Sequence, residues 1–157
     1  DAFEFWCPKR RPAGNNIAMK IEPALNAFSA EFLRNGIQRP VASTNAWVAN
    51  LNDANPAVTV NWQDSVTINK VELFFDADYD HPLETVLLHN PETKMVFCAD
   101  QVQLFNDKNE LVASIEGNYL SRRTIEFEKP VTSKQLKVML SNSNTNAPAS
   151  LFEIRCY

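Results

Sequence analysis

From Val58 onward, hydrophobic and polar residues alternate with a period of two along short segments rich in Val, Ile and Phe. With this period, every second side chain faces the same side of a strand, so one face can be buried while the other meets solvent. These segments cover about residues 58–75, 96–104, 111–115, 124–128, 135–140 and 152–156. The pattern is typical of half-buried antiparallel strands, and it predicts an all-β sandwich.

The longest of these segments changes phase once. Its hydrophobic positions are even-numbered from Val58 to Ile68 and odd-numbered from Val71 to Phe75. One residue must therefore be inserted near positions 69–70, as in a β-bulge or a strand bend.

Two signals divide the later segments. The run Asn106-Asp107-Lys108-Asn109 favours a tight turn, so the segments on either side of it are predicted to form a hairpin. Lys129-Pro130 follows the inward residues Ile125 and Phe127. Because proline has no N–H to donate, we expect the ladder to break there.

The N-terminal third has a different pattern. Between Pro23 and Arg34, the residues Leu25, Phe28 and Phe32 recur at helix-like spacing. A proline suits the first helical turn, and the Asn-Gly pair that follows suits the end of a helix. We therefore expect one short helix in this stretch.

Length and composition predict a single domain. A chain of 157 residues can bury one substantial core, and its 45% hydrophobic and 22% charged residues are ordinary for a globular domain. The sequence contains no internal repeat and no Gly/Ser-rich linker. We expect a terminal arm over residues 1–16 and one domain over residues 17–157.

Charge and composition exclude several classes of partner. The net charge of -4 argues against nucleic acid, because affinity for a phosphate backbone comes mainly from Lys and Arg. No stretch approaches the roughly 18 apolar residues of a membrane span. Only three glycines occur, which excludes glycine-rich phosphate loops.

The sequence offers little catalytic chemistry. His81 and His89 are the only histidines, neither lies in an HExxH spacing, and no serine has a GxSxG context. Asp76, Asp78 and Asp80 could in principle serve as glycosidase carboxylates or as Ca²⁺ ligands. Their simpler interpretation is a group of solvated loop charges. We predict that the chain is not an enzyme.

The cysteines leave two alternatives open. Cys7, Cys98 and Cys156 show no CxxC spacing, which excludes zinc-ribbon and thioredoxin-type sites. A disulfide between Cys7 and Cys156 is possible if the first and last strands are neighbours. Alternatively, Cys156 fills a core position on the same strand face as Phe152 and Ile154, since a free cysteine behaves as a small hydrophobic residue.

Several motifs resemble the discoidin modules, also called coagulation factor 5/8 type C modules. They are Asn35-Gly36-Ile37-Gln38-Arg39-Pro40, Asn45-Ala46-Trp47-Val48, Val66-Thr67-Ile68-Asn69-Lys70-Val71-Glu72-Leu73 and Leu151-Phe152-Glu153-Ile154-Arg155-Cys156-Tyr157. The resemblance implies a galactose-binding-domain-like jelly-roll β-sandwich. More closely, Gly117-Asn118-Tyr119, Arg122-Arg123 and Phe152-Glu153-Ile154-Arg155 resemble the module that closes secreted bacterial FAD-dependent oxidoreductases, some described as xanthan lyases.

The resemblance implies a non-catalytic, carbohydrate-binding-like module from the C-terminus of a larger secreted bacterial enzyme, an FAD-dependent oxidoreductase or a polysaccharide lyase. It implies a periplasmic or extracellular location, a polysaccharide or glycan partner, contact with the parent enzyme domain, and no cofactor in this domain itself. The alternative is a structural or protein-interaction appendage that packs on its parent enzyme and binds no sugar.

Members of the family often hold a structural calcium between an Asp-Gly loop and a Glu of the last strand. The resemblance therefore makes Asn35 and Glu153 the candidate calcium ligands here. Asn35 stands where the Asp is expected, so one charged ligand is missing, and fewer charged ligands weaken such a site.

Sugar recognition needs a flat aromatic face and planar polar side chains, placed on loops at one end of the sandwich. The candidate ligand-binding residues are Arg39, Asn45, Tyr79, His81, Asn118, Tyr119, Arg122 and Arg123. The Asn-rich loop 142–146 could join them. Each also has a purely structural interpretation, since arginines pair with surface carboxylates and asparagines suit turns. Trp47 and Trp62 are expected in the core or covering a sheet.

Overall fold

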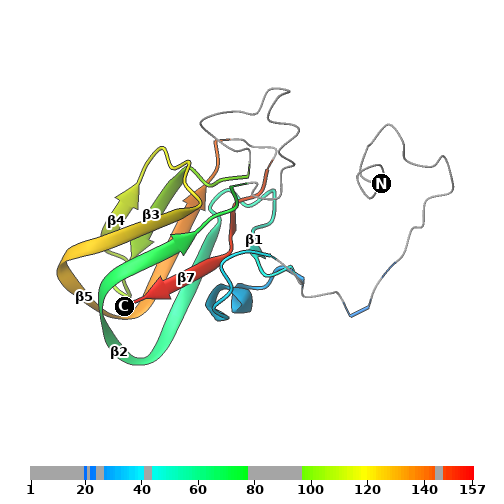
Figure 1. Cartoon of the computed structure of the whole chain (residues 1–157). Coiled ribbons are helices and arrows are strands. Elements are labelled where there is room, and N and C mark those ends of the chain that lie inside the picture. Colours follow the sequence, from blue (N-terminus) through cyan, green and yellow to red (C-terminus); the bar gives the residue numbers. More distant parts are fainter. Residues whose placement is uncertain (1–19, 21, 24–26, 41–43, 78–96, 144–146) are drawn as a thin grey trace, which may run out of the picture.

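The computed structural model describes residues 20, 22–23, 27–40, 44–77, 97–143 and 147–157. The elements in this part of the chain are the 3₁₀ helix η3 (Ala30–Arg34) and the strands β1 (Trp47–Val48), β2 (Ala57–Phe74), β3 (Gln101–Phe105), β4 (Leu111–Ile115), β5 (Arg122–Ser141), β6 (Ser150–Leu151) and β7 (Glu153–Cys156) (Figure 1). The predicted all-β class is confirmed.

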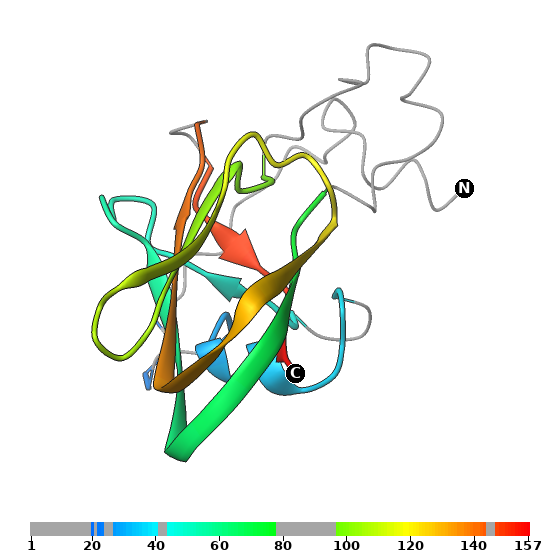
Figure 2. The same ribbon diagram turned by 90° about the vertical axis from the view of Figure 1, so that its left-hand side faces the viewer.

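Two long strands, β2 and β5, build both layers of the sandwich. They pair antiparallel, and the strand order of their sheet is β4-β3-β5-β2-β7, beside a two-stranded sheet of β1 and β6. Both long ribbons turn back sharply at one end of the molecule (Figure 2). As a result, β3 pairs with the second half of β5, over 137–141, whereas β7 pairs with the second half of β2, over 71–74.

The turning points coincide with irregular pairing. The register between β2 and β5 shifts between Asn61 and Val66 and again between Ile68 and Lys70. The second shift confirms the insertion expected near residues 69–70. On β5 the pairing passes from Glu126 to Val131, so the ladder is interrupted around Pro130 as expected, although the strand itself continues to Ser141.

The main core cluster lies between the two layers. Its fully buried members come from the long strands and from their neighbours; they include Val71, Leu73, Leu104, Leu136, Val138 and Leu151. Trp47 and Trp62 pack against this cluster, as expected. Burial of apolar surface contributes about 25 cal/mol per Å², so this continuous cluster is the main source of stability.

The hairpin prediction is confirmed, and the helix prediction is partly wrong. Strands β3 and β4 pair antiparallel across the predicted turn. The helical stretch is one short 3₁₀ turn, in which Ser29 caps the N-terminus by accepting a hydrogen bond from the Glu31 N–H at 3.2 Å. Leu33 is the buried residue of this turn, whereas Phe32 is partly buried and Phe28, which precedes the turn, is half exposed. Leu25 lies outside the described residues.

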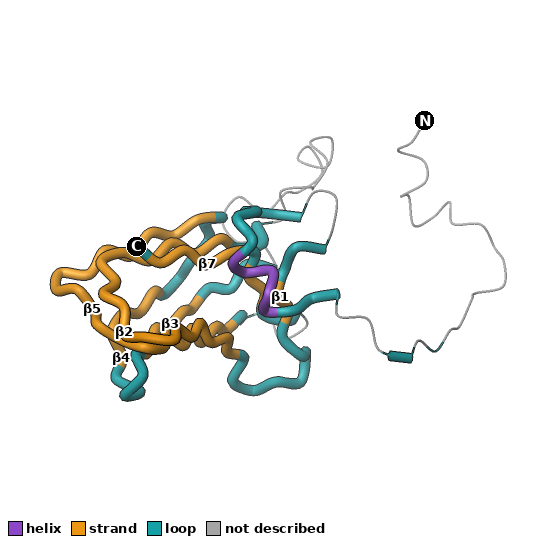
Figure 3. Tube along the Cα trace, turned by 90° about the horizontal axis from the view of Figure 1, so that it is seen from below, coloured by secondary structure: helices purple, strands orange, loops and turns teal. Residues whose placement is uncertain are grey.

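The helix lies beside β1 and β7 (Figure 3). The expected terminal arm, residues 1–16, and the domain boundary at residue 17 lie outside the described residues. Within the part of the chain that is described, no helix is long and apolar enough to cross a membrane.

Candidate functional site

The described residues that flank the long strands, 49–56, 75–77, 116–121 and 142–143, lie at the end of the sandwich opposite the sharp bends (Figures 1 and 2). Several hollows open among them, and two contain predicted site residues. We call the first the arginine cleft; it measures about 320 Å³ and is lined by Gln38, Arg39, Phe74, Phe75, Ala77, Ser121, Arg122 and Phe152. It brings together two of the predicted site residues, Arg39 and Arg122.

Arg122 is held in the arginine cleft by a carboxylate and an aromatic ring. It is the first residue of β5 and lies directly opposite Phe74 of β2. Its Nη2 donates a hydrogen bond to Glu72 Oε1 at 2.6 Å, and its guanidinium carbon lies 5.6 Å from the centre of the Phe74 ring. A guanidinium carries five N–H donors, so a side chain fixed in this way can still donate to a ligand.

Glu72 is the anchor of this arrangement. Its side chain is 5% exposed, and its carboxylate also contacts Lys70 Nζ at 3.2 Å and the Tyr157 hydroxyl, which donates at 3.3 Å. The hydrogen bond from Arg122 is the largest of the effects that hold the pKa of Glu72 below its ordinary value of 4.5. Glu72 is therefore charged at neutral pH and keeps the Arg122 guanidinium in place.

The floor of the arginine cleft is a second, smaller apolar cluster. Phe74, Phe152 and Ala46 are buried together on the outer face of β2, and the Phe152 N–H donates to the Phe74 carbonyl at 2.8 Å. Sequence reasoning missed these residues as part of a site. The signal was present in the consecutive run of Leu73, Phe74 and Phe75, since a strand covered on both faces shows continuous hydrophobicity instead of alternation.

The neighbouring arginine does not join the cleft. Arg123 lies opposite Leu73, one position further along β5 than Arg122, so the two side chains leave the sheet on opposite faces. Tyr119 is 57% exposed in the loop before β5, but it is not among the described residues that line the arginine cleft. Tyr79 and His81 lie outside the described residues.

Two predicted ligand residues, Asn45 and Asn118, are fully buried and hold loops together instead of facing solvent. Asn118 Nδ2 donates to the Ala99 carbonyl at 3.0 Å, and its backbone N–H donates to the Asp100 carbonyl at 2.8 Å. Asn45 Nδ2 donates to the Ile37 carbonyl at 2.8 Å. The expectation that these amides meet a ligand directly is corrected: they position the loops that could.

The backbone conformation at position 45 also favours asparagine. Its φ is +30°, in the region that most L-residues avoid and that asparagine tolerates comparatively well. The loop between η3 and β1 therefore turns at a residue whose side chain is at the same time a buried hydrogen-bonding group.

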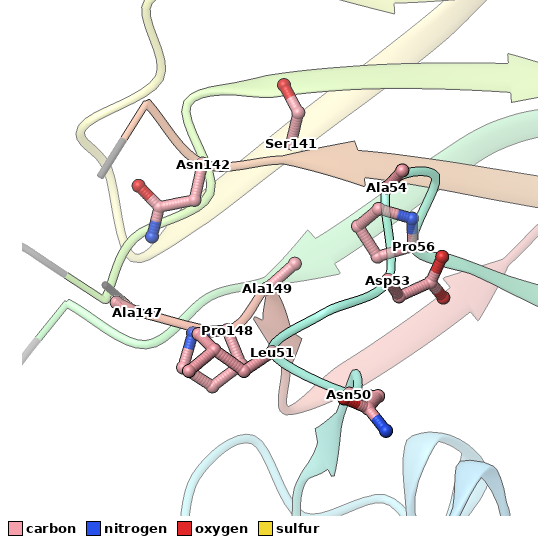
Figure 4. A pocket seen from close by; sticks show the side chains of 10 residues that line it. All are labelled: Asn50, Leu51, Asp53, Ala54, Pro56, Ser141, Asn142, Ala147, Pro148 and Ala149. Atoms are coloured by element: carbon pink, nitrogen blue, oxygen red, sulfur yellow. The ribbon is translucent and has the colours of Figure 1, made fainter. Parts of the chain in front are cut away.

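The second hollow, which we call the amide pocket, lies between residues 50–56 on one side and residues 141–142 and 147–149 on the other. It measures about 230 Å³, and Figure 4 shows Asn142 on one side and Asp53 on the other, with Ala149 between them and Leu51 and Pro148 below. The Asn-rich loop predicted to join the site contributes Asn142 here; its residues 144–146 lie outside the described part. The lining offers amides, one carboxylate and apolar surface, but no arginine among its described residues.

The candidate metal ligands are not joined directly. Glu153 accepts a hydrogen bond from Arg155 Nε, whereas Asn35 bonds Asn45 and Ile37. The Gly36 carbonyl, next to Asn35, accepts from Arg155 Nη2. Among the described residues, no group of three or more His, Cys, Asp or Glu side chains could hold a metal ion.

Cys156 is a free cysteine, and burial raises the pKa of its thiol to about 11. This is in keeping with the alternative in which Cys156 packs against the core. Cys7 lies outside the described residues.

Comparison with known proteins defines the fold. No family model matches the sequence, and no curated protein matches it either. Solved structures do. The family 32 carbohydrate-binding module of Streptococcus pneumoniae EndoD matches with a TM-score of 0.63 at 12% identity, over 87% of this chain and 90% of that module.

Two further modules match over 84% of this chain and 86% of their own length. The family 32 module of C. perfringens NanJ, solved in complex with galactose, has a TM-score of 0.57 at 16% identity. The chitosan-binding module 1 of a chitosanase/glucanase from Paenibacillus sp. IK-5 has a TM-score of 0.58 at 19% identity. The likeness confirms the predicted β-sandwich fold.

Proposed function

We propose that this chain is a non-catalytic carbohydrate-binding module whose ligand binds at the loop end of the sandwich. The fold supports the proposal, because matching structures are carbohydrate-binding modules by name. Fold alone does not assign function, so the proposal depends on the site. The single observation that carries it is the arginine cleft, where Arg39 and Arg122 line one hollow above buried aromatic residues.

The charge of the arginine cleft favours an acidic saccharide. Its described lining residues include two arginines and no carboxylate, although Glu72 pairs with Arg122 from beneath and the protein as a whole carries a net charge of -4. A guanidinium presents a planar fork of donors that matches a carboxylate and also donates to hydroxyl groups. A uronate residue offers both groups on one ring.

The proposal is tested by affinity electrophoresis and calorimetry with a soluble polyuronate and with a neutral galactan. We expect retention on the polyuronate, and an affinity roughly 10- to 100-fold lower in Arg122→Ala, because a hydrogen bond to a charged group contributes about 1.5–3 kcal/mol. Arg123→Ala is the matched control, since it removes the adjacent arginine on the opposite face. Absence of binding to both polymers, or equal losses in the two variants, would contradict the proposal.

A second candidate function is supported by exposed apolar side chains near Asn118. Phe97, Tyr119 and Leu120 are 43%, 57% and 42% exposed, and Asn118 ties together the two segments that carry them. Such side chains suit an appendage that packs on another protein domain. Tyr119→Ser with Leu120→Ser separates the candidates: sugar binding in the arginine cleft survives these substitutions, whereas packing on a parent domain is lost.

We also propose that the domain belongs to a larger secreted bacterial protein, located in the periplasm or outside the cell. The support is the resemblance of its motifs to the C-terminal module of FAD-dependent oxidoreductases. The test is the reading frame that precedes this sequence, in which a dinucleotide-binding fingerprint, GxGxxG after a strand, is the expected finding. A catalytic domain without any flavin-binding motif would contradict the oxidoreductase part of the proposal.

A further inference from the structure

The loop from Asn35 to Asn45 is closed by its own amide groups. Asn35 Nδ2 donates to Asn45 Oδ1, and Asn45 Nδ2 donates to the Ile37 carbonyl at 2.8 Å. The Ile37 N–H in turn donates to Asn35 Oδ1 at 2.9 Å. The side-chain oxygens of both asparagines thus already accept protein N–H groups, and these three hydrogen bonds hold residues 35–37 against Asn45.

The Arg155 guanidinium connects this loop to the last strand. Its Nε donates to Glu153 Oε1 at 2.7 Å, and its Nη2 lies 3.4 Å from the Gly36 carbonyl, which accepts a long hydrogen bond. Its guanidinium carbon lies 5.1 Å from the centre of the Phe74 ring. The hydrogen bond to Glu153 is the main cause that raises the pKa of Arg155, so this side chain is a permanent positive charge.

The residues at this place do not fit a calcium ion. Calcium takes six to eight oxygen ligands, several of them carboxylates. The hollow beside β7 measures about 330 Å³, and among its described lining residues Glu153 is the one acidic side chain, whereas Arg34 and Arg155 are both cationic. Glu153 Oε2 is buried without a hydrogen-bond partner, but it is a single oxygen. A divalent cation here would face two positive side chains.

We propose that the Arg155 guanidinium supplies the positive charge between Glu153 and the Gly36 carbonyl, and that the 35–45 loop therefore needs no calcium ion. A buried carboxylate is costly unless a positive charge and hydrogen bonds compensate it, and Glu153 is 2% exposed. The guanidinium supplies the charge together with directed donors, one toward the strand and one toward the loop. Arg39 lies in this loop, three residues after Gly36. The contact between Arg155 and the Gly36 carbonyl therefore also positions one wall of the arginine cleft.

The first test needs no variant. Thermal unfolding of the metal-stripped protein is compared in EDTA and in millimolar CaCl₂, and terbium is titrated while its luminescence is followed, with Trp62 of the same hollow as the sensitiser. We expect the same Tm in both solutions and no saturable terbium signal. A Tm that rises with calcium, or saturable terbium binding lost in Glu153→Gln, would overturn the proposal.

The second test removes the guanidinium. Arg155→Gln is expected to lower the Tm by about 5 °C and to speed amide hydrogen exchange at residues 36–40 and 44–46, while exchange in the β3–β4 hairpin stays unchanged. Arg34→Gln is the matched control, because Arg34 lines the same hollow without bonding Glu153, and its Tm is expected to stay within about 1 °C. Arg155→Lys, which keeps the charge, is expected to lie in between. Equal behaviour of Arg155→Gln and Arg34→Gln would overturn the proposal.

Discussion

The arginine cleft and the amide pocket lie at the same end of one sandwich and differ in how they are built. In the arginine cleft, one charged group stands on a strand and is fixed from below: Arg122, the first residue of β5, is held by Glu72 and by the Phe74 ring. In the amide pocket, the polar groups stand on loops, and the side chain of Leu51 is 54% exposed. The comparison suggests that one hollow is preorganised for a charged ligand, whereas the other is merely a gap between loops.

The largest expected difference concerns stability. Phe74→Ala removes a buried ring from the floor of the arginine cleft and should lower the free energy of unfolding by about 3–5 kcal/mol, because the cavity left behind cannot collapse fully. Leu51→Ala in the amide pocket should change it by less than about 0.5 kcal/mol, since that side chain is largely exposed. Urea titration followed by tryptophan fluorescence measures both. A similar decrease in the free energy of unfolding in the two variants would mean that the two hollows do not differ in how firmly their walls are packed.

A smaller difference concerns salt. Binding of a polyuronate through guanidinium groups should weaken several-fold between about 50 and 300 mM NaCl, because added ions screen the attraction. Binding to the amide pocket should change little, as its described lining contains no arginine. Asn142→Ala is the control that should leave polyuronate affinity unchanged. If affinity does not depend on salt and is lost in Asn142→Ala, then the ligand occupies the amide pocket.

The smallest expected effect concerns pH. The folded-state pKa of Glu72 lies below its unfolded value near 4.5, so between these values the unfolded chain binds more protons than the folded one. Its contribution to stability is therefore present above pH 4.5 and is lost as the pH falls through the folded-state value. In Glu72→Gln, the decline of the unfolding free energy below pH 4.5 should be shallower. An unchanged slope would mean that Glu72 does not anchor Arg122.

The strand pattern could be predicted because burial alternates with sequence along each strand. The phase change near residues 69–70 marked the register shift, and the Asn-rich turn marked the β3–β4 hairpin. The predicted short helix is present, but its extent and its buried face could not be predicted. Three hydrophobic residues at helix-like spacing fit several short structures, and only tertiary packing selects which side chain is buried. Here the 3₁₀ turn buries Leu33.

The candidate site was harder to predict, because side-chain roles depend on cross-strand partners that are far apart in sequence. Arg122 and Arg123 are neighbours along the chain, yet the pleat separates them to opposite faces. Asn45 and Asn118 look like polar loop residues, but both are buried hydrogen-bonding groups. Nothing in the sequence alone indicates that Arg155 reaches a loop more than a hundred residues away.

The two long strands have a mechanical consequence for the whole domain. Since β2 and β5 each pass through both layers, one layer cannot unfold while the other stays intact. The bends near residues 62–65 and 127–130 join the two layers covalently. Denaturation should therefore occur in a single cooperative step. The loops at the far end can vary in sequence with little effect on that step, so such a scaffold can acquire new ligands while its frame stays unchanged.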